Sequence, residues 1–172
     1  MKDYIKKKLE DFYEKCGNIE SKLDRYDDIY QKQWKRDKDD ISKNLYQQIT
    51  STSDVIQYID YFLGSVEREK SLSVLNLDIY DVELALYKAV YALKKMANQY
   101  DNNKCSFSID EKQVDELFDK MEQAYTDMKA ELLCRTSYWK VKVMRKKVYC
   151  YEKIYNPCFN SGFNVKFMRL FK

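Results

Sequence analysis

The sequence predicts an all-α protein: an elongated helical bundle with a long N-terminal heptad helix, followed by an extended basic and aromatic C-terminal arm. Its 172 residues include three Gly and one Pro, too few for the closely spaced turns of a β-sandwich or barrel. Apolar residues recur at helical spacing in several segments, and no long alternating run precedes residue 137. The hydrophobic class makes up 45% and charged residues 34% of the chain, a composition that can bury a core.

The first helix is predicted by a heptad pattern. Its apolar positions are spaced alternately by four and three residues: Ile5, Leu9, Phe12, Cys16, Ile19, Leu23, Tyr26 and Tyr30. A helix from about residue 2 to residue 33 would carry one apolar stripe, which must pack against another helix. Gly17 and Asn18 lie inside this run, and Gly costs about 1 kcal/mol relative to Ala in a helix interior. The sequence therefore allows a kink or a break at this point.

A second helical pattern surrounds Trp34. The charged residues 35–40 predict a solvated helix face or a connection. Apolar residues then return at helical spacing at Ile41, Leu45 and Ile49.

The Thr and Ser residues at 50–53 are favourable N-caps for the next helix. We expect a short helix over 54–63 that is central and buried, because it is apolar on several sides. Gly64 is predicted to close it as a C′ glycine. Residues 67–76 are predicted to form a linker or short turn.

Two further helices are predicted from acidic N-caps. Asp78 and Asp110 each follow an apolar residue and precede a valine by four positions, which is the arrangement of a hydrophobic staple. The apolar stripes that follow are Val82, Leu86, Ala89, Leu93, Met96 and Tyr100 for the first helix, and Val114, Leu117, Met121, Tyr125, Met128 and Leu132 for the second. Together with the N-terminal helix, these faces suffice for a bundle. The stripe tyrosines Tyr26, Tyr100 and Tyr125 are expected in the core, with hydroxyl groups that reach water.

The C-terminal arm (residues 135–172) differs in composition from residues 1–134, which we assign to the helical bundle. The arm holds ten basic residues and one acid, Glu152, for a charge of +9, whereas residues 1–134 carry −6. We expect 135–155 to continue the preceding helix, although the alternation over 139–143 also fits a strand and leaves that alternative open. Pro157 ends any helix, and the alternating apolar residues beyond it predict an extended tail.

Catalytic, metal and cofactor chemistry is not predicted. The sequence has no His, the commonest general base and metal ligand. The five Cys are widely spaced without a C-x-x-C pair, so we expect free and mostly buried thiols. The acidic pairs at 27–28 and 39–40 are adjacent on a helix and point about 100° apart, so they are expected on the solvated surface. No phosphate-binding loop or nucleophile motif occurs. We therefore expect no enzyme and no cofactor.

The arm is the part of the sequence that predicts binding. Its candidate partner-binding residues are Trp139, Arg145, Lys146, Lys147, Tyr149, Tyr151, Phe159, Phe163, Phe167 and Phe171. Aromatic residues are enriched at protein interfaces, so the expected partners are proteins: copies of this chain or other subunits of an assembly. The alternative is nucleic acid, because cations bind phosphates and aromatic rings stack on unpaired bases. The alternative function is accordingly a small nucleic-acid-binding protein or regulator.

The predicted plan, a small helical bundle with an extended aromatic arm, resembles the adaptor or ring subunits of tailed-phage connectors. The resemblance is architectural and carries no residues over. Lys, Asn, Tyr and Ile total 60 residues against 16 for Gly, Ala, Pro and Arg, which indicates an AT-rich gene, as in a low-GC bacterium, its phage, a parasite or a large virus. The charged N-terminal segment and the lack of long apolar segments predict a cytoplasmic protein at synthesis without a membrane partner. We thus expect a non-enzymatic structural or adaptor protein, incorporated into a virion.

Overall fold

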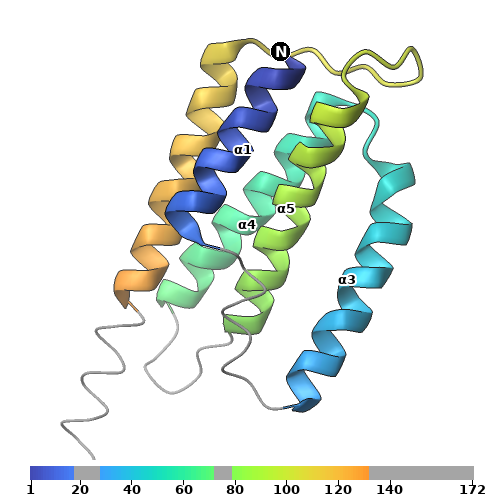
Figure 1. Ribbon diagram of the computed structural model, residues 1–172. Helices are drawn as coiled ribbons and strands as arrows, with labels where there is room; N and C mark the ends of the chain where they lie inside the picture. Colours follow the sequence, from blue (N-terminus) through green and yellow to red (C-terminus); the bar gives the residue numbers. More distant parts are fainter. Residues whose placement is uncertain (18–27, 72–78, 132–172) are drawn as a thin grey trace, which may run out of the picture. The chain divides into compact units, whose positions relative to one another are not determined.

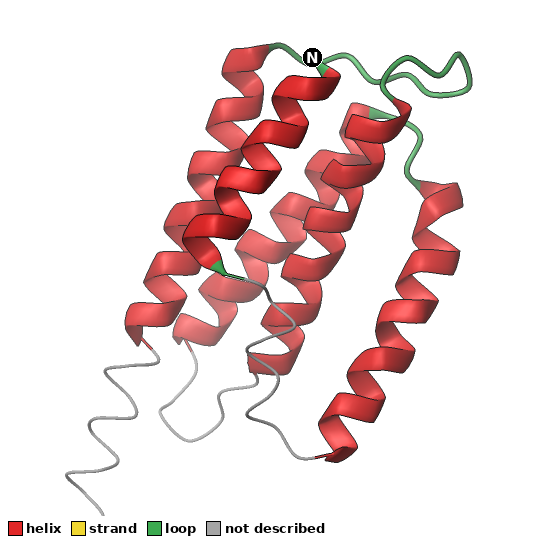
Figure 2. Cartoon of the chain, in the orientation of Figure 1, coloured by secondary structure: helices red, strands yellow, loops and turns green. Residues whose placement is uncertain are grey.

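The computed structural model describes residues 1–17, 28–71 and 79–131 (Figure 1). The labelled helices are α1 (Lys2–Cys16), α3 (Asp28–Gln48), α4 (Thr52–Ser71) and α5 (Ile79–Gln99), and a further helix spans 111–131. Within this part of the chain the only β-type pairing is an isolated bridge between Ser51 and Ser106 (Figure 2). The predicted all-α class is confirmed for the described residues. The predicted domain boundary after residue 134 lies outside them.

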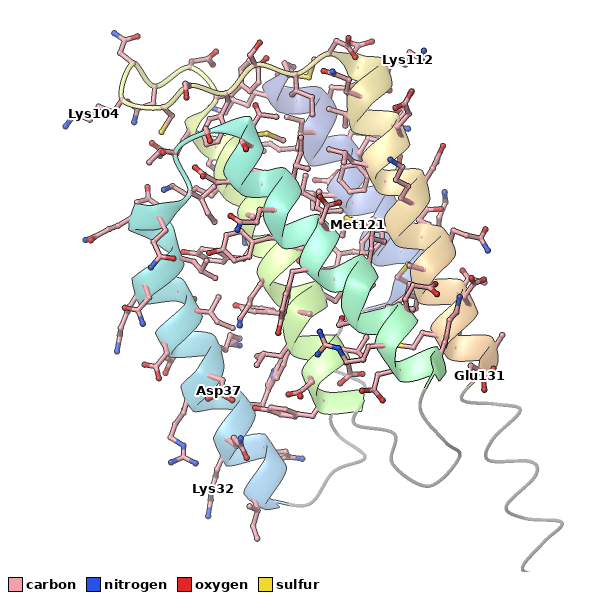
Figure 3. The ribbon with its side chains drawn as sticks, turned by 180° about the vertical axis from the view of Figure 1, so that it is seen from behind. Lys32, Asp37, Lys104, Lys112, Met121 and Glu131 are labelled. Carbon is pink, nitrogen blue, oxygen red and sulfur yellow. The ribbon has the colours of Figure 1, made fainter. Side chains whose placement is uncertain are left out.

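Four of the helices form a bundle and the fifth packs outside it. Helix α5 contacts both α1 and α4, and helix 111–131 lies beside α1 and α4 on the remaining side of the bundle (Figure 1). Helix α3 packs on α5. In the views of Figures 1 and 3, α1, α4 and helix 111–131 run in one direction and α3 and α5 run in the other.

Helix α1 is shorter than the heptad pattern predicts. Its stripe residues Ile5, Leu9, Phe12 and Cys16 are buried as expected, but the helix ends at Cys16. Gly17 has φ 74° and ψ 167°, and its amide donates to the Tyr13 carbonyl. A continuous helix to residue 33 is therefore wrong, because this left-handed backbone, which favours Gly, cannot continue a helix. Of the remaining predicted stripe positions, Ile19, Leu23 and Tyr26 lie outside the described residues, and Tyr30 belongs to α3.

The core is built most regularly by α5. Val82, Leu86, Ala89, Leu93 and Met96 are all buried, as the sequence predicts. Their recurrence every three or four residues keeps them on the faces that α1 and α4 cover. This helix therefore forms the centre of the described structure.

Helix 111–131 differs from its predicted stripe at one position. Val114, Met121, Tyr125 and Met128 are buried, and Met121 projects from this helix into the bundle (Figure 3). Leu117, however, is half-buried, and the neighbouring Phe118 takes the core position.

Helix α4 is longer than predicted. It continues through Gly64 to Ser71, so Gly64 is not a C′ glycine, and residues 67–71 of the predicted linker are helical. Val55, Ile59 and Phe62 are buried, but Tyr61 is 49% exposed. The helix is thus amphipathic, with one buried face, and is not enclosed on all sides.

The charged run that follows Trp34 is part of α3. Trp34, Ile41, Leu45 and Ile49 are buried, whereas Asp39 and Asp40 lie on the exposed face. The prediction of a solvated helix face is confirmed.

Reciprocal side-chain caps begin two of the helices. At the start of α4, the Ser51 and Thr50 amides both donate to Asp54 Oδ2 at 2.8 Å, and the Asp54 amide donates to Ser51 Oγ at 3.3 Å. At the start of helix 111–131, the Gln113 amide donates to Asp110 Oδ1 at 2.7 Å, and the Asp110 amide donates to Gln113 Oε1 at 3.1 Å. Both are capping boxes. The predicted N-caps at 50–53 and at Asp110 are confirmed, while Asp78 lies outside the described residues.

Helix 111–131 is held by lysines from both neighbouring helices. Lys8 and Lys15, seven residues apart on α1, pair with Asp115 and Glu122, also seven residues apart, at 2.6 and 2.9 Å. On the α4 side, Lys70 Nζ lies 2.9 Å from Asp127 Oδ2. Equal heptad spacing on the two helices is the pattern expected for a parallel pair.

Candidate functional site

The ten partner-binding residues predicted from the sequence all lie between Trp139 and Phe171, outside the described residues. The same is true of 135–155, for which helix and strand remain open. The described structure offers a different candidate surface, which centres on α5 where it meets α3.

Aromatic side chains fill the contact between α3 and α5. The Trp34 indole packs edge-on against Tyr80 and Tyr87, with ring centroids 5.9 and 5.5 Å apart. Tyr87 stacks on Tyr91 one turn further along α5, at 6.4 Å. The Tyr80 hydroxyl donates to Asp37 Oδ2 at 2.6 Å, and Asp37 lies on α3 (Figure 3). Burial and then this hydrogen bond raise the pKa of Tyr80 well above its usual range.

A groove of 530 Å³ follows α5 between the end of α1 and the second half of α3. We call it the tyrosine–lysine groove. Its lining residues are Tyr13, Ser42, Tyr46, Tyr87, Val90, Tyr91, Lys94, Lys95, Asn98 and Gln99. Four of these ten are tyrosines and two are lysines, and none is acidic. The groove is therefore amphipathic and carries positive charge.

Hydrogen bonds to α3 fix two of the lining side chains. The Tyr91 hydroxyl donates to the Ser42 carbonyl at 3.0 Å. Gln99 Nε2 donates to the Tyr46 hydroxyl at 3.1 Å. Burial, and then the nearby Tyr87 and Tyr46, raise the pKa of Tyr91, so its hydroxyl stays protonated at neutral pH. These bonds hold the walls of the groove before any ligand is bound.

Lys95 is the unusual residue of this groove. Lys95 is only 7% exposed, and its Nζ lies over the Tyr46 ring, 4.4 Å from the ring centroid. A cation–π contact of this kind contributes about 0.5 to 2 kcal/mol. Among the described residues no carboxylate forms an ion pair with this ammonium, which distinguishes it from Lys8, Lys15 and Lys70.

Burial lowers the pKa of Lys95, although the charges of Cys105 and Asp54 oppose that effect. The Asp54 carboxylate already accepts the backbone amides of Thr50 and Ser51 in the α4 cap. The Lys95 ammonium is thus a desolvated cation with an aromatic neighbour and no paired anion. Burying such a group without a full partner costs free energy.

A second groove of 600 Å³ lies between α4 and helix 111–131 and has the opposite character. Apolar surface comes from Ile56, Leu63 and Leu117, and the charged lining residues are two acids and one lysine: Asp60, Glu116 and Lys120. The two grooves are therefore chemically distinct surfaces of one unit.

The described residues do not assemble a chemical centre. No group of three or more Cys, Asp or Glu side chains within 1–17, 28–71 and 79–131 could hold a metal ion. Cys16 is buried and Cys105 is half-buried, and neither forms a disulfide bond with another described residue. None of the helices in this part of the chain has the length and apolarity needed to cross a membrane.

A sequence pattern on α5, separate from its apolar stripe, indicates one side of this groove. Tyr87, Tyr91, Lys94 and Asn98 recur at helical spacing on α5, and they mark a polar and aromatic face beside the apolar one. No such pattern predicts that Tyr13 and Tyr46 line the groove, because their positions depend on how α1 and α3 pack.

The described residues thus form a helical bundle with an amphipathic groove. A scan of protein-family models finds no match to the chain, and searches of curated proteins and of solved structures find none either.

Proposed function

We propose that the protein is a non-enzymatic structural or adaptor protein that makes contacts between the subunits of an assembly. The observation that carries this proposal is the tyrosine–lysine groove. Tyrosine is enriched at protein interfaces because its ring supplies apolar contact and its hydroxyl supplies a hydrogen bond. A surface built from tyrosine, lysine and amide side chains on three rigid helices is suited to hold a polypeptide in a defined orientation.

The setting of the groove favours recognition over catalysis. Tyr91 and Gln99 are engaged by hydrogen bonds to α3, and no acidic side chain lines the groove. A surface that binds without reacting is what a subunit of a particle requires.

The C-terminal arm supplies the second part of the proposal. Its aromatic residues would contact a neighbouring subunit, while the groove receives another contact. Two different surfaces on one chain give head-to-tail contacts, which close into rings when the rotation permits. This is the basis for proposing a ring-like or connector-like component of a phage or virus particle, made in the cytoplasm and then incorporated.

The proposal is tested by the mass of the complex in which the natural protein is found. We expect multi-angle light scattering of the purified complex to give several subunits. Asn98→Arg, which places a large cation in the groove, should reduce the assembled fraction. Thr126→Arg, on the exposed face of helix 111–131, is the matched control and should assemble normally. A monomer without bound protein in the native extract would contradict the proposal.

A truncation tests the role of the arm separately. A chain that ends at Tyr155 should remain a stable helical monomer and lose its place in the assembly. If this chain instead unfolds, the tail belongs to the core of its own subunit and the arm does not act in assembly.

The alternative function is nucleic-acid binding by the arm, favoured by its ten basic residues against one acid. Binding through phosphates gives a steep salt dependence, with log K falling by roughly 0.7 to 0.9 per phosphate contact against log salt. A steep slope with a single-stranded oligonucleotide would favour this alternative, and the absence of a gel shift at low salt would exclude it.

A further inference from the structure

The tyrosine–lysine groove contains a buried cation with which no described carboxylate forms an ion pair. Lys95 is nine-tenths buried and lines the groove, and its Nζ contacts the Tyr46 ring. The other buried charged groups among the described residues are Glu69 of α4 and Glu83 of α5, and neither lines the groove. Lys95 is therefore the one buried ammonium in the described structure, and it lies where a ligand can reach it.

The charge of the whole lining agrees with that of Lys95. Lys94 adds a second ammonium, which is exposed, and no Asp or Glu lines the groove. The second groove, between α4 and helix 111–131, contains both Asp60 and Glu116. The lack of acidic lining residues is thus a property of this groove and not of the described surface in general. A group that binds here should be anionic.

The length and openness of the groove favour a polypeptide segment over a small molecule. From Tyr87 to Gln99, α5 advances about 18 Å at 1.5 Å per residue, which equals about five residues of extended chain. Small ligands are usually enclosed on most of their surface, whereas this groove lies open between two helices. Tyr13, Tyr46 and Asn98 line it with rings, hydroxyls and an amide that can pair with a peptide backbone.

We propose that the tyrosine–lysine groove binds an acidic segment of a partner protein, with one carboxylate of that segment placed against the Lys95 ammonium. The Tyr46 ring holds the ammonium in position before binding, so little side-chain ordering remains when the partner arrives. Lys94 attracts the segment from the open side, and the tyrosine rings contact its apolar parts. This inference rests on the proposed assembly function and specifies the chemistry of the partner.

Zero-length cross-linking with a carbodiimide tests the contact in the full-length chain. The probe is a hexaglutamate peptide at low salt, and mass spectrometry identifies each lysine that forms an amide with a glutamate carboxylate. We expect cross-links at Lys94 and Lys95 to exceed those at the exposed residues Lys104 and Lys112 (Figure 3) by at least severalfold. Equal yields at all four lysines would overturn the proposal.

A substitution distinguishes binding to the buried Lys95 ammonium from general attraction between opposite charges. Lys95→Met keeps an unbranched side chain that is one heavy atom shorter and removes its charge, so the core should tolerate it, as circular dichroism will show. Cross-linking at Lys94 should then fall severalfold, while cross-linking at Lys146 and Lys147 in the arm stays unchanged. Lys112→Met is the matched control and should leave Lys94 unaffected. An unchanged cross-linking yield at Lys94 in the Lys95→Met chain would contradict the placement of a carboxylate against Lys95.

Two further outcomes separate this inference from the proposed function and from nucleic-acid binding. If Lys95→Met forms the natural complex with unchanged mass and stability, the assembly function stands and the groove inference fails. If the wild-type chain forms no complex, the assembly function fails independently of the groove. A single-stranded oligonucleotide with the same charge as the peptide provides a last comparison. If it protects Lys94 and Lys95 from amine labelling at a lower concentration than the peptide does, the acidic-segment proposal is also overturned.

Discussion

Phe12 of α1 and Phe118 of helix 111–131 are in contact across the bundle, with ring centroids 6.0 Å apart and ring planes inclined by 60°. More than a hundred residues of sequence separate them, and both are almost completely buried. The aromatic contact lies between the Lys8–Asp115 and Lys15–Glu122 ion pairs along the same two helices. It therefore fixes the register of α1 against helix 111–131.

Replacement of Phe118 should strongly destabilise the protein. Phe118→Ala leaves a cavity in the core and should lower the free energy of unfolding by about 3 to 5 kcal/mol. Leu117→Ala is the matched control, because Leu117 is only half-buried and should cost roughly 1 kcal/mol. Urea denaturation of both variants measures the difference. Equal losses would mean that the helix is rotated relative to the described structure.

The glycines Gly64 and Gly17 should respond to alanine with opposite signs. Gly64 is exposed inside α4, and a Cβ built there meets no atom within 4 Å, so Gly64→Ala should stabilise the protein by about 0.5 to 1 kcal/mol. Gly17 has φ 74°, so Gly17→Ala should destabilise it by about 1 to 3 kcal/mol. Thermal unfolding measures both effects. A destabilised Gly64→Ala chain would restore the prediction that α4 ends at this residue.

The capping box of helix 111–131 should contribute measurably to stability. Asp110→Ala removes the acceptor of the Gln113 amide and should lower the free energy of unfolding by about 1 kcal/mol. Lys112→Ala, an exposed change in the same turn, should stay within roughly 0.5 kcal/mol of the wild type. Chemical denaturation compares the two variants, and a similar result for both would show that the cap does not support the helix.

Acid should destabilise the fold through specific carboxylates. Hydrogen bonds from Lys8 and Tyr4 lower the pKa of Asp115, and hydrogen bonds from Lys70 and Gln123 lower that of Asp127. A lowered pKa means that the unfolded chain binds protons first as the pH falls. The stability from these groups is therefore fully present above the ordinary carboxyl value of about 4 and is lost as the pH falls through the folded value.

The pH dependence can be assigned with one variant. Asp115→Asn should flatten part of the decline in unfolding free energy below about pH 4. Asp101→Asn, at an exposed loop position, serves as the control. If the two variants lose stability with acid to the same extent as the wild type, the ion pair with Lys8 does not form in solution.

The helices that were predicted well are those whose signals are local. The stripe from Val82 to Met96 and the Asp110 cap depend on residues within a few turns of each other, so the sequence determines them directly. Gly64 misled the prediction, because a glycine that can end a helix is also tolerated inside one when tertiary packing holds the flanking residues Phe62 and Val66. The Leu117 assignment failed because Leu117 and Phe118 are adjacent apolar residues and either one fits the helical spacing between Val114 and Met121, so the spacing alone does not choose between them.

The candidate site was less predictable than the fold. The tyrosine–lysine groove brings together Tyr13, Tyr46 and Tyr91 from three helices, and no periodicity within one segment shows such proximity. The burial of Lys95 could not be predicted from the sequence, because a lysine is normally exposed and the burial of this one follows from the position of α3. The residues predicted from the arm lie outside the described part of the chain, so their role stays a prediction.

The side-by-side placement of α1 and helix 111–131 also determines the order of events on the ribosome. The apolar residues Ile5, Leu9 and Phe12 are synthesised before helix 111–131, which covers part of them and emerges more than a hundred residues later. At about 5 to 20 residues per second, this interval lasts on the order of ten seconds. During that time the nascent chain exposes an amphipathic helix to which a chaperone can bind, and the bundle closes only when the last described helix has been made.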